Sequence, residues 1–196
     1  MKFIIGIDEV GRGSLAGPVT VAVACMPWNL KIINRSLGKL RDSKKLTAKQ
    51  RERWFNFFKN HNGINCALAR VFPRQIEKIN ISQAANLAAL RAYKKLNFKL
   101  KISNAKIFLD GGLFLGRGEQ PKNAKTVIRG DEKIRAVSIA SIIAKVSRDR
   151  AMVRLARVYP QYGFDVNKGY GTRKHLKAIK KHGPSKVHRL TFLRFS

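Results

Sequence analysis

Apolar and polar residues follow one another along this chain in a pattern that predicts alternating strands and helices. Short apolar runs bounded by glycine, proline or charged residues predict β-strands at residues 3–8, 19–25, 64–71, 106–110 and 126–128. Apolar residues at helical spacing predict helices at 47–58, 82–96 and 138–158. Thr47 is a candidate N-cap for the first helix, and Pro27 is expected to end the second strand.

The order of these elements indicates the fold class. Three successive strands can form a meander, and the later strands alternate with helices. Such an order is typical of an α/β domain with a mixed sheet. The residues beyond 160 are rich in Lys, His and Gly and predict short helices and loops, so we expect one domain over residues 1–196.

Charge narrows the choice of partner. The chain has 41 Lys and Arg against 11 Asp and Glu, which gives a net charge of +30 at pH 7. The basic residues are spread along the whole length, so the charge belongs to a folded surface rather than to a disordered tail. Nucleic acid is the first candidate partner, because each phosphate that is neutralised releases condensed counterions.

The apolar runs are too short for a membrane protein. Asp8 and Glu9 interrupt the first run at once, which excludes a signal peptide there, and no run approaches the roughly 20 residues of a membrane span. We therefore expect a soluble, cytoplasmic protein with no membrane partner, and a monomer.

The scarce acidic residues follow apolar strands. Asp8 and Glu9 are consecutive at the first predicted strand, Asp110 ends a later strand, and Asp131 follows the next one, with a glycine close to each. If these strands are neighbours in one sheet, the four carboxylates meet in one cleft. Their oxygens suit Mg²⁺ or Mn²⁺. Two such ions about 4 Å apart could clamp the attacking water and the leaving oxygen of a phosphodiester.

Surface ion pairs are the alternative for these acids, and the repeated strand-then-glycine context disfavours it. Asp149 is different, because it lies inside a predicted helix among basic residues, where we expect an ion pair. The turn Gly11-Arg12-Gly13 with Gly17 misses the dinucleotide-binding spacing by one residue. We expect its glycines to let a nucleic-acid strand approach the backbone.

Ordered motifs from Gly6 to Phe192 resemble those of one known family. The opening Gly6-Ile7-Asp8-Glu9-Val10-Gly11-Arg12-Gly13, with Leu15-Ala16-Gly17-Pro18, is similar to the N-terminal signature of type 2 ribonuclease H (ribonuclease HII). The later motifs, in the family's order, are Asp42-Ser43-Lys44-Lys45-Leu46, Asp110-Gly111, Gly130-Asp131, Ser141-Ile142-Ile143-Ala144-Lys145-Val146 with Arg148-Asp149, Tyr159-Pro160-Gln161-Tyr162-Gly163, Lys168-Gly169-Tyr170-Gly171-Thr172, and His188-Arg189 with Phe192. The resemblance covers nearly the whole chain.

The resemblance implies a ribonuclease H-like fold. This fold has a central five-stranded mixed β-sheet flanked by α-helices, with a small C-terminal helical part at about residues 160–196 that binds substrate. The implied activity is cleavage of the RNA strand of RNA/DNA hybrids and of duplex DNA on the 5′ side of single embedded ribonucleotides. It leaves a 3′-hydroxyl and a 5′-phosphate by two-metal-ion catalysis with Mg²⁺ or Mn²⁺, so the implied partners are these two duplexes.

The resemblance also implies roles for individual residues. Asp8, Glu9, Asp110 and Asp131 fall on the catalytic, metal-binding acids. Gly11, Arg12 and Gly13 fall on the loop that reads the ribose 2′-hydroxyl, and Tyr170 falls on the tyrosine that stacks against the adjoining deoxyribose. Lys44, Lys45, Ser141, Lys145, His188 and Arg189 fall on positions near substrate phosphates. Gly112 departs from the pattern, because the family usually has a larger residue there.

Two other functions stay open on the sequence alone. A DNA resolvase or integrase-like nuclease on the same fold would also use clustered acids and a basic surface, although the Gly-Arg-Gly loop disfavours it. A non-enzymatic basic nucleic-acid-binding protein would use its acids only for structure. Acids of that kind are expected on polar faces rather than after apolar strands.

Overall fold

A mixed β-sheet forms the centre of the computed structural model, which describes residues 2–32, 34–38, 40, 43–100, 102, 104–115 and 120–193. Its strands are β1 (Phe3–Val10), β2 (Val19–Pro27), β3 (Asn65–Val71), β4 (Ala105–Asp110) and β5 (Ala124–Val127), in the spatial order β3-β2-β1-β4-β5. The first three strands form the expected antiparallel meander. β4 pairs parallel to β1, and β5 pairs parallel to β4. The predicted mixed five-stranded sheet is thereby confirmed in the described part of the chain.

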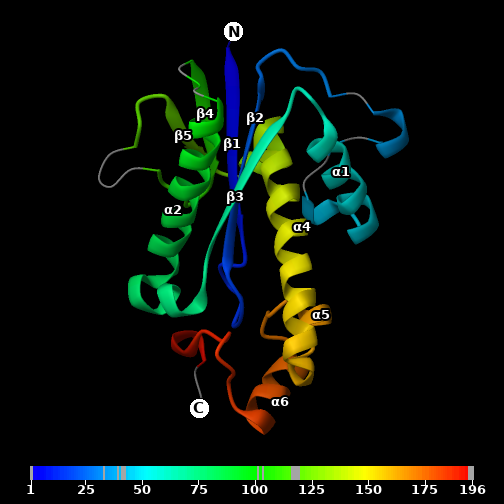
Figure 1. The fold of residues 1–196 in the computed structure, drawn as a ribbon, viewed down its shortest axis with the longest axis vertical. Helices are drawn as coiled ribbons and strands as arrows, with labels where there is room; N and C mark the ends of the chain where they lie inside the picture. Colours follow the sequence, from blue (N-terminus) through cyan, green and yellow to red (C-terminus); the bar gives the residue numbers. More distant parts are fainter. Residues whose placement is uncertain are drawn as a thin grey trace.

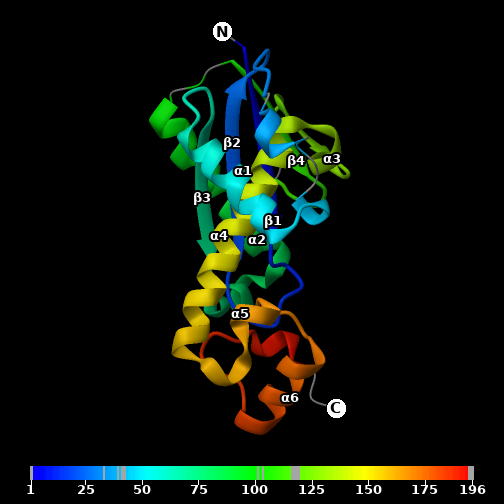
Figure 2. The ribbon, with the colours of Figure 1, turned by 90° about the vertical axis from the view of Figure 1, so that its right-hand side faces the viewer.

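Helices cover both faces of this sheet. They are α1 (Ala48–Asn60), α2 (Pro73–Leu100), α3 (Gly130–Lys133), α4 (Arg135–Val158), α5 (Phe164–Asn167) and α6 (Arg173–His182). Figure 1 shows α2 on one side of the sheet and α1 with α4 on the other, and Figure 2 shows the C-terminal elements beyond the end of the sheet. No helix in the described ranges combines the length and apolarity that a membrane span needs.

The alternation of β2 explains the two layers. Val19, Val21, Val23 and Cys25 point into the core under α2, whereas the even positions from Ala22 to Met26 pack against α1 and α4. The even positions carry small side chains at 22 and 24, which lets α4 pack close to the sheet.

One glycine sets the closest approach of α4 to the sheet. A Cβ atom at Gly6 in β1 would lie 2.1 Å from the backbone carbon of Ala136 in the first turn of α4. Only glycine can occupy this position, since every other residue would push the helix away from the strand. Asp8 and Glu9 follow two and three residues later on the same strand.

Several element boundaries differ from the prediction; β5 spans Ala124–Val127 instead of 126–128, and α4 begins at Arg135 instead of 138. Strand β1 continues to Val10 because Glu9 and Val10 still pair with Val21 and Thr20 of β2, so Glu9 lies inside the strand together with Asp8. Helix α2 consists of two helical segments that meet at a kink at Asn80, whose φ is 61°. The predicted helix at 82–96 lies in the second segment, and the first, which begins at Pro73, was not predicted. The predicted N-cap is confirmed, because the Thr47 hydroxyl accepts a hydrogen bond from the Gln50 amide in a capping box.

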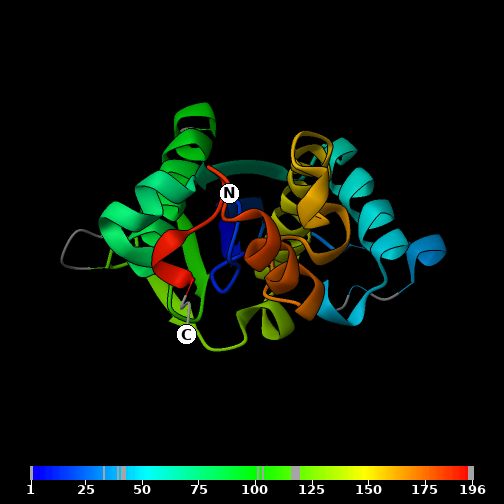
Figure 3. The same ribbon diagram turned by 90° about the horizontal axis from the view of Figure 1, so that it is seen from below.

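A separate apolar cluster holds the C-terminal part on α4. Met152 of α4 packs with Ala16, Tyr162, Phe164 and Ile179. Seen from below in Figure 3, the C-terminal segment crosses the end of the sheet between the α2 side and the α4 side. The loop after β1 is therefore in contact with the end of the chain.

Candidate active site

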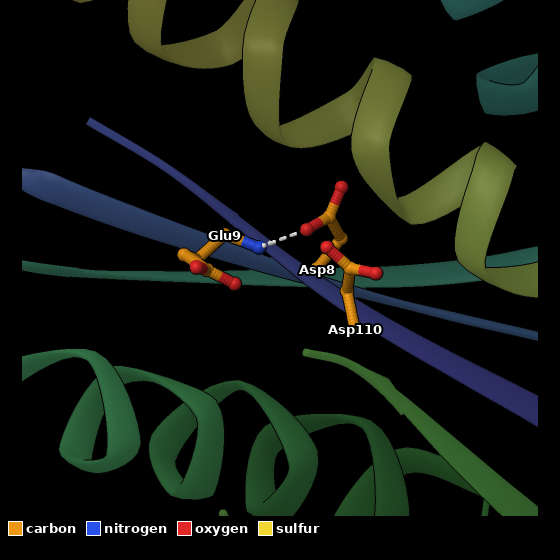
Figure 4. Close-up of side chains that lie close together, drawn as sticks. All are labelled: Asp8, Glu9 and Asp110. Atoms are coloured by element: carbon orange, nitrogen blue, oxygen red, sulfur yellow. Dashed lines mark hydrogen bonds between the residues drawn. The ribbon is translucent and has the colours of Figure 1, made fainter. Parts of the chain in front are cut away.

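Three of the four predicted metal-binding acids lie together at the end of the sheet. Strands β1 and β4 pair in parallel with Ile7 beside Leu109, so Asp8 and Asp110 occupy the next position on neighbouring strands. One oxygen from each of Asp8, Glu9 and Asp110 lies within 4.8 Å of the others. Figure 4 shows these side chains, with a dashed line for the 2.7 Å hydrogen bond from the Glu9 amide to Asp8 Oδ1.

The electrostatics of this cluster favour a cation. Burial raises the pKa of Asp8 well above its usual value, and the neighbouring charges of Glu9 and Asp110 raise it further. Burial likewise raises the pKa of Glu9, against the opposing effect of Arg12. Glu9 Oε2 is buried and has no hydrogen-bond partner among the described residues. A bound cation would offset both the repulsion and the lost hydration.

Asp131 lies close to this cluster in a different element. It is buried in α3, and the amide of the preceding Gly130 donates a 2.7 Å hydrogen bond to Asp110 Oδ1. Its backbone carbonyl accepts a hydrogen bond from the Ser138 hydroxyl of α4. Within the described ranges, its carboxylate is not one of those whose oxygens lie within 4.8 Å of each other. Its role as a fourth ligand stays a prediction.

The acids open onto a cavity of about 220 Å³ that other predicted residues share. Its lining consists of Asp8, Glu9, Val10, Ser43, Asp110, Ser141, Lys145 and Tyr170. The hydroxyls of Ser43 and Ser141 lie 2.8 Å apart. Ser43 and Val10 were not predicted as site residues; the sequence signal for Ser43 was its place in the Ser43-Lys44-Lys45 motif. A larger groove of about 360 Å³ lies between α1 and α4 and contains none of the clustered acids.

Helix α4 supplies one face of this site in regular steps. Ser138 contacts the carbonyl of Asp131, and Ser141 hydrogen-bonds to Asp8. Lys145 lies 6.0 Å from the ring centre of Tyr170 and forms a 3.0 Å ion pair with Asp149. This pair confirms the predicted helical role of Asp149. The spacing of three to four residues places these side chains on one face.

The turn Gly11-Arg12-Gly13 lies beside the acids. Arg12 Nη1 is 3.3 Å from Glu9 Oε1 and 3.4 Å from the Gly112 carbonyl, and Nη2 is 3.1 Å from Ser82 Oγ. Gly112 has a φ of +85°, and a Cβ atom there would lie 2.9 Å from Arg12 Nη1. Glycine at this departure from the family pattern therefore makes room for the arginine.

Two residues predicted to lie near substrate phosphates are buried. His188 is 2% exposed and Arg189 is 0% exposed, and the side chains of both form hydrogen bonds with other groups of the protein. Their place near substrate phosphates stays a prediction. Lys45 is exposed and lies 3.5 Å from Glu132. The side chain of Lys44, together with Asp42, falls outside the described residues.

Comparison with known proteins identifies the family. The family model of ribonuclease HII matches residues 5–195. A curated ribonuclease HII of Pelagibacter ubique is 45% identical over 196 residues, with 98% of this chain and 96% of the relative covered. The chain belongs to the ribonuclease HII family. As a ribonuclease H, it is a hydrolase that acts on the RNA of RNA/DNA hybrids.

Solved structures place the ribonuclease HII chain in the expected fold. The crystal structure of ribonuclease H2 from Pyrococcus horikoshii superimposes with a TM-score of 0.73 at 26% identity, covering 96% of this chain and 93% of that one. Bst-RNase HIII, solved in complex with Mn²⁺, gives a TM-score of 0.70 at 20% identity over 97% of this chain and 67% of that one. The predicted ribonuclease H-like fold is confirmed.

Proposed function

We propose that this chain cuts duplex DNA on the 5′ side of a single embedded ribonucleotide, as well as the RNA strand of hybrids, and leaves a 3′-hydroxyl and a 5′-phosphate. The observation that carries the proposal is the cavity that Asp8, Glu9 and Asp110 share with Tyr170. The clustered acids and an aromatic ring that can stack on a sugar border one space. A nucleic acid bound there would present a phosphate to the acids and a neighbouring sugar to the ring.

The acids fit divalent cations, Mg²⁺ or Mn²⁺. The candidate ligands are carboxylate oxygens, which divalent cations such as Mg²⁺ prefer. One of them, Glu9 Oε2, has no hydrogen-bond partner among the described residues and is therefore available to bind an ion. Asp8, Glu9 and Asp110 would hold the ions, with Asp131 as the proposed fourth ligand. When bound, two such ions supply a water of lowered pKa as the nucleophile and balance the charge on the leaving 3′ oxygen.

The protein orients its carboxylates before any ion arrives. Asp8 Oδ1 accepts a hydrogen bond from the Glu9 amide, and Asp110 Oδ1 accepts one from the Gly130 amide, each of 2.7 Å. These bonds fix the rotation of each carboxylate. Lys145 lines the same cavity and places a positive charge where a substrate phosphate would enter. Such prior orientation lowers the cost of reaching the reactive geometry.

We expect the loop Gly11-Arg12-Gly13 to distinguish ribose from deoxyribose. Gly11 has a φ of +90°, and a Cβ atom built at Gly13 would meet no heavy atom of its surroundings within 4 Å. The loop backbone is therefore open to a sugar at this point. Backbone groups that bond a 2′-hydroxyl reject plain DNA, because with DNA they are left unpaired, and such rejection can reach about 10⁴-fold.

The test is a cleavage assay on three matched duplexes with Mg²⁺ or Mn²⁺. The first contains one ribonucleotide in DNA, the second has a uniform RNA strand, and the third is all DNA. We expect cuts in the first two only, with the single cut mapped to the 5′ side of the ribose and a product that carries a 3′-hydroxyl. A cut in the all-DNA duplex, or in a four-way DNA junction without ribose, would instead support a resolvase-like enzyme.

A further inference from the structure

The segment Val187–Arg189 is attached to the glycine loop by backbone hydrogen bonds. The Gly17 amide donates to the Val187 carbonyl, and the Arg189 amide donates to the Leu15 carbonyl, both at 2.8 Å. Ala16 and His188 form an antiparallel bridge between these bonds. A piece of chain near the C-terminus thus extends the loop that follows β1 as a short two-stranded ladder.

Arg189 holds the same loop through its side chain. Its Nη1 donates to the Arg12 carbonyl at 2.8 Å, and its Nε and Nη2 donate to the Gly17 carbonyl at 3.1 and 2.9 Å. The side chain forms no ion pair with an acid in the described part of the chain. Backbone carbonyls, together with the Phe192 ring 5.2 Å away, therefore balance a fully buried charge, which ties the two ends of the loop to one rigid group.

A second buried arginine reinforces this arrangement. Arg148 of α4 donates to the Pro18 carbonyl at 3.0 Å, to the Ser14 hydroxyl at 2.7 Å and to the Ala16 carbonyl at 3.2 Å. It also donates to the Lys168 carbonyl at 2.9 Å, two residues before Tyr170. The loop and the tyrosine segment are thus bonded to the same side chain.

His188 reaches in the other direction, toward Tyr170. Its Nδ1 accepts a 2.9 Å hydrogen bond from the Ser185 amide, and its Nε2 lies 3.1 Å from Nε2 of His175. His175 Nδ1 lies 2.8 Å from the Tyr170 carbonyl, which can only accept. The partners at the two ends therefore assign the protons: His175 carries its proton on Nδ1, and His188 carries its proton on Nε2.

We propose that Val187–Arg189 is a positioning element that sets the spacing between the ribose-reading loop and Tyr170. Arg189 fixes the carbonyls of Arg12 and Gly17, while His188 fixes the backbone of Tyr170 through His175. Neither side chain touches the nucleic acid. The inference rests on the proposed function, in which the loop and the tyrosine read adjoining sugars, and it adds that selectivity for the junction depends on their fixed separation.

The surroundings keep the two histidines neutral. Their rings pack against those of Tyr162 and Phe164, and His182 faces Tyr162 from α6. Burial and the Tyr170 carbonyl act on the pKa of His175, the first lowering it and the second raising it. Burial and the adjacent His175 lower the pKa of His188 to about 4. A directed chain of hydrogen bonds needs both rings in the neutral form, and this setting provides it.

The experiment compares two substitutions of His175 that differ in one hydrogen bond. In His175→Asn, the amide can still donate to the Tyr170 carbonyl, whereas His175→Leu fills the space without a donor. Cleavage of a single-ribonucleotide duplex and of a uniform hybrid is measured for each, with His182→Asn as the control outside the chain of bonds. We expect His175→Leu to lower the ratio of junction to hybrid kcat/KM by about 10-fold or more, and the two asparagine variants to keep the ratio within about 3-fold.

Arg189→Lys tests the hydrogen bonds between the Arg189 side chain and the loop. A lysine cannot donate to the Arg12 and Gly17 carbonyls in the same fork geometry, so the loop is expected to shift relative to Tyr170. We expect the ratio of junction to hybrid kcat/KM to fall as in His175→Leu, and an unchanged ratio would count against the inference. Equal ratios for His175→Leu and the wild type would overturn the inference. If the wild type cuts neither substrate, the proposed function itself has failed.

A spectroscopic readout judges the hydrogen-bond chain independently of activity. Imidazole ¹⁵N shifts of the folded protein should show His175 protonated on Nδ1 and His188 protonated on Nε2 at pH 7. The opposite protonation of either ring would refute the chain of bonds that links His188 to Tyr170. The same measurement on each variant shows whether it is folded, so that a lower ratio of junction to hybrid kcat/KM is not mistaken for unfolding.

Discussion

Replacing Asp110 by Asn distinguishes two effects of the acid cluster: the loss of stability that its charge repulsion causes, and the metal binding on which cleavage depends. Asparagine keeps an Oδ1 that can accept the hydrogen bond from the Gly130 amide, so the local structure should survive. It removes one of three negative charges whose oxygens lie within 4.8 Å of each other. We expect this variant to be more stable than the wild type without metal and less stable than the wild type with it.

The size of the effect follows from the geometry. Two unit charges 4.8 Å apart repel by about 3 kcal/mol at an effective dielectric constant of about 20. Asp110 faces two such charges, but it is half-buried and solvent reduces the repulsion. A net gain of about 2 kcal/mol corresponds to a rise in Tm of about 4–8 °C for a chain of this size. Saturating Mg²⁺ at about 100 times its Kd should stabilise the wild type by about 2.7 kcal/mol.

Thermal unfolding at pH 8, with EDTA and then with increasing Mg²⁺, gives both numbers. The Tm curves of the wild type and Asp110→Asn should cross as Mg²⁺ is added, and cleavage by the variant should be abolished while hybrid binding is retained. Glu52→Gln is the matched control, because Glu52 pairs with Arg150 on an exposed surface away from the cluster. Its Tm should fall by no more than about 2–4 °C, with the Mg²⁺ response intact. A metal-free Asp110→Asn protein less stable than the wild type would refute the electrostatic reasoning.

Three further predictions concern substrate, salt and pH. Tyr170→Ala should lower kcat/KM on single-ribonucleotide duplexes more than on uniform hybrids, and equal losses would reject the stacking role. With a net charge of +30, kcat/KM should fall by about tenfold or more between 50 and 200 mM salt, and a flat salt profile would count against phosphate-driven binding. The pKa of His188 is lowered in the fold from 6.5 to about 4, so its neutral form stabilises the native state above pH 6.5. That stability should be lost as pH falls from 6.5 to 4 in urea unfolding curves, and His188→Gln should flatten this slope.

The local sequence predicts most of the sheet and the acid cluster. The first four strands are evident because each one alternates or concentrates apolar residues within a few positions, whereas β5, with the sequence Ala-Lys-Thr-Val, was predicted two residues too late. Asp8, Glu9 and Asp110 were found for the same reason, since each stands at a fixed place relative to its own strand. The parallel pairing of β1 with β4 then brings them together.

The features that the sequence did not reveal depend on distant partners. Arg189 bonds to Gly17, 172 positions away, and nothing in the neighbourhood of Arg189 distinguishes a buried arginine from a surface one. The end of β1 at Val10 depends on pairing with Thr20. The early start of α2 was missed because its first turns are polar and Asn80 interrupts the helical pattern.

Because the contacts of α4 follow one another along the helix, the active site should be sensitive to any residue inserted into or deleted from α4. Ser138, Ser141 and Arg148 contact α3, Asp8 and the loop in turn, and Lys145 lies 6.0 Å from the ring centre of Tyr170. A single residue inserted after Ser138 would rotate every later side chain by about 100° and advance it by about 1.5 Å. The active site would then lose its contacts to α4 all at once, whereas most single substitutions remove one. Relatives are thus expected to vary in length in their loops and to keep this helix free of insertions and deletions.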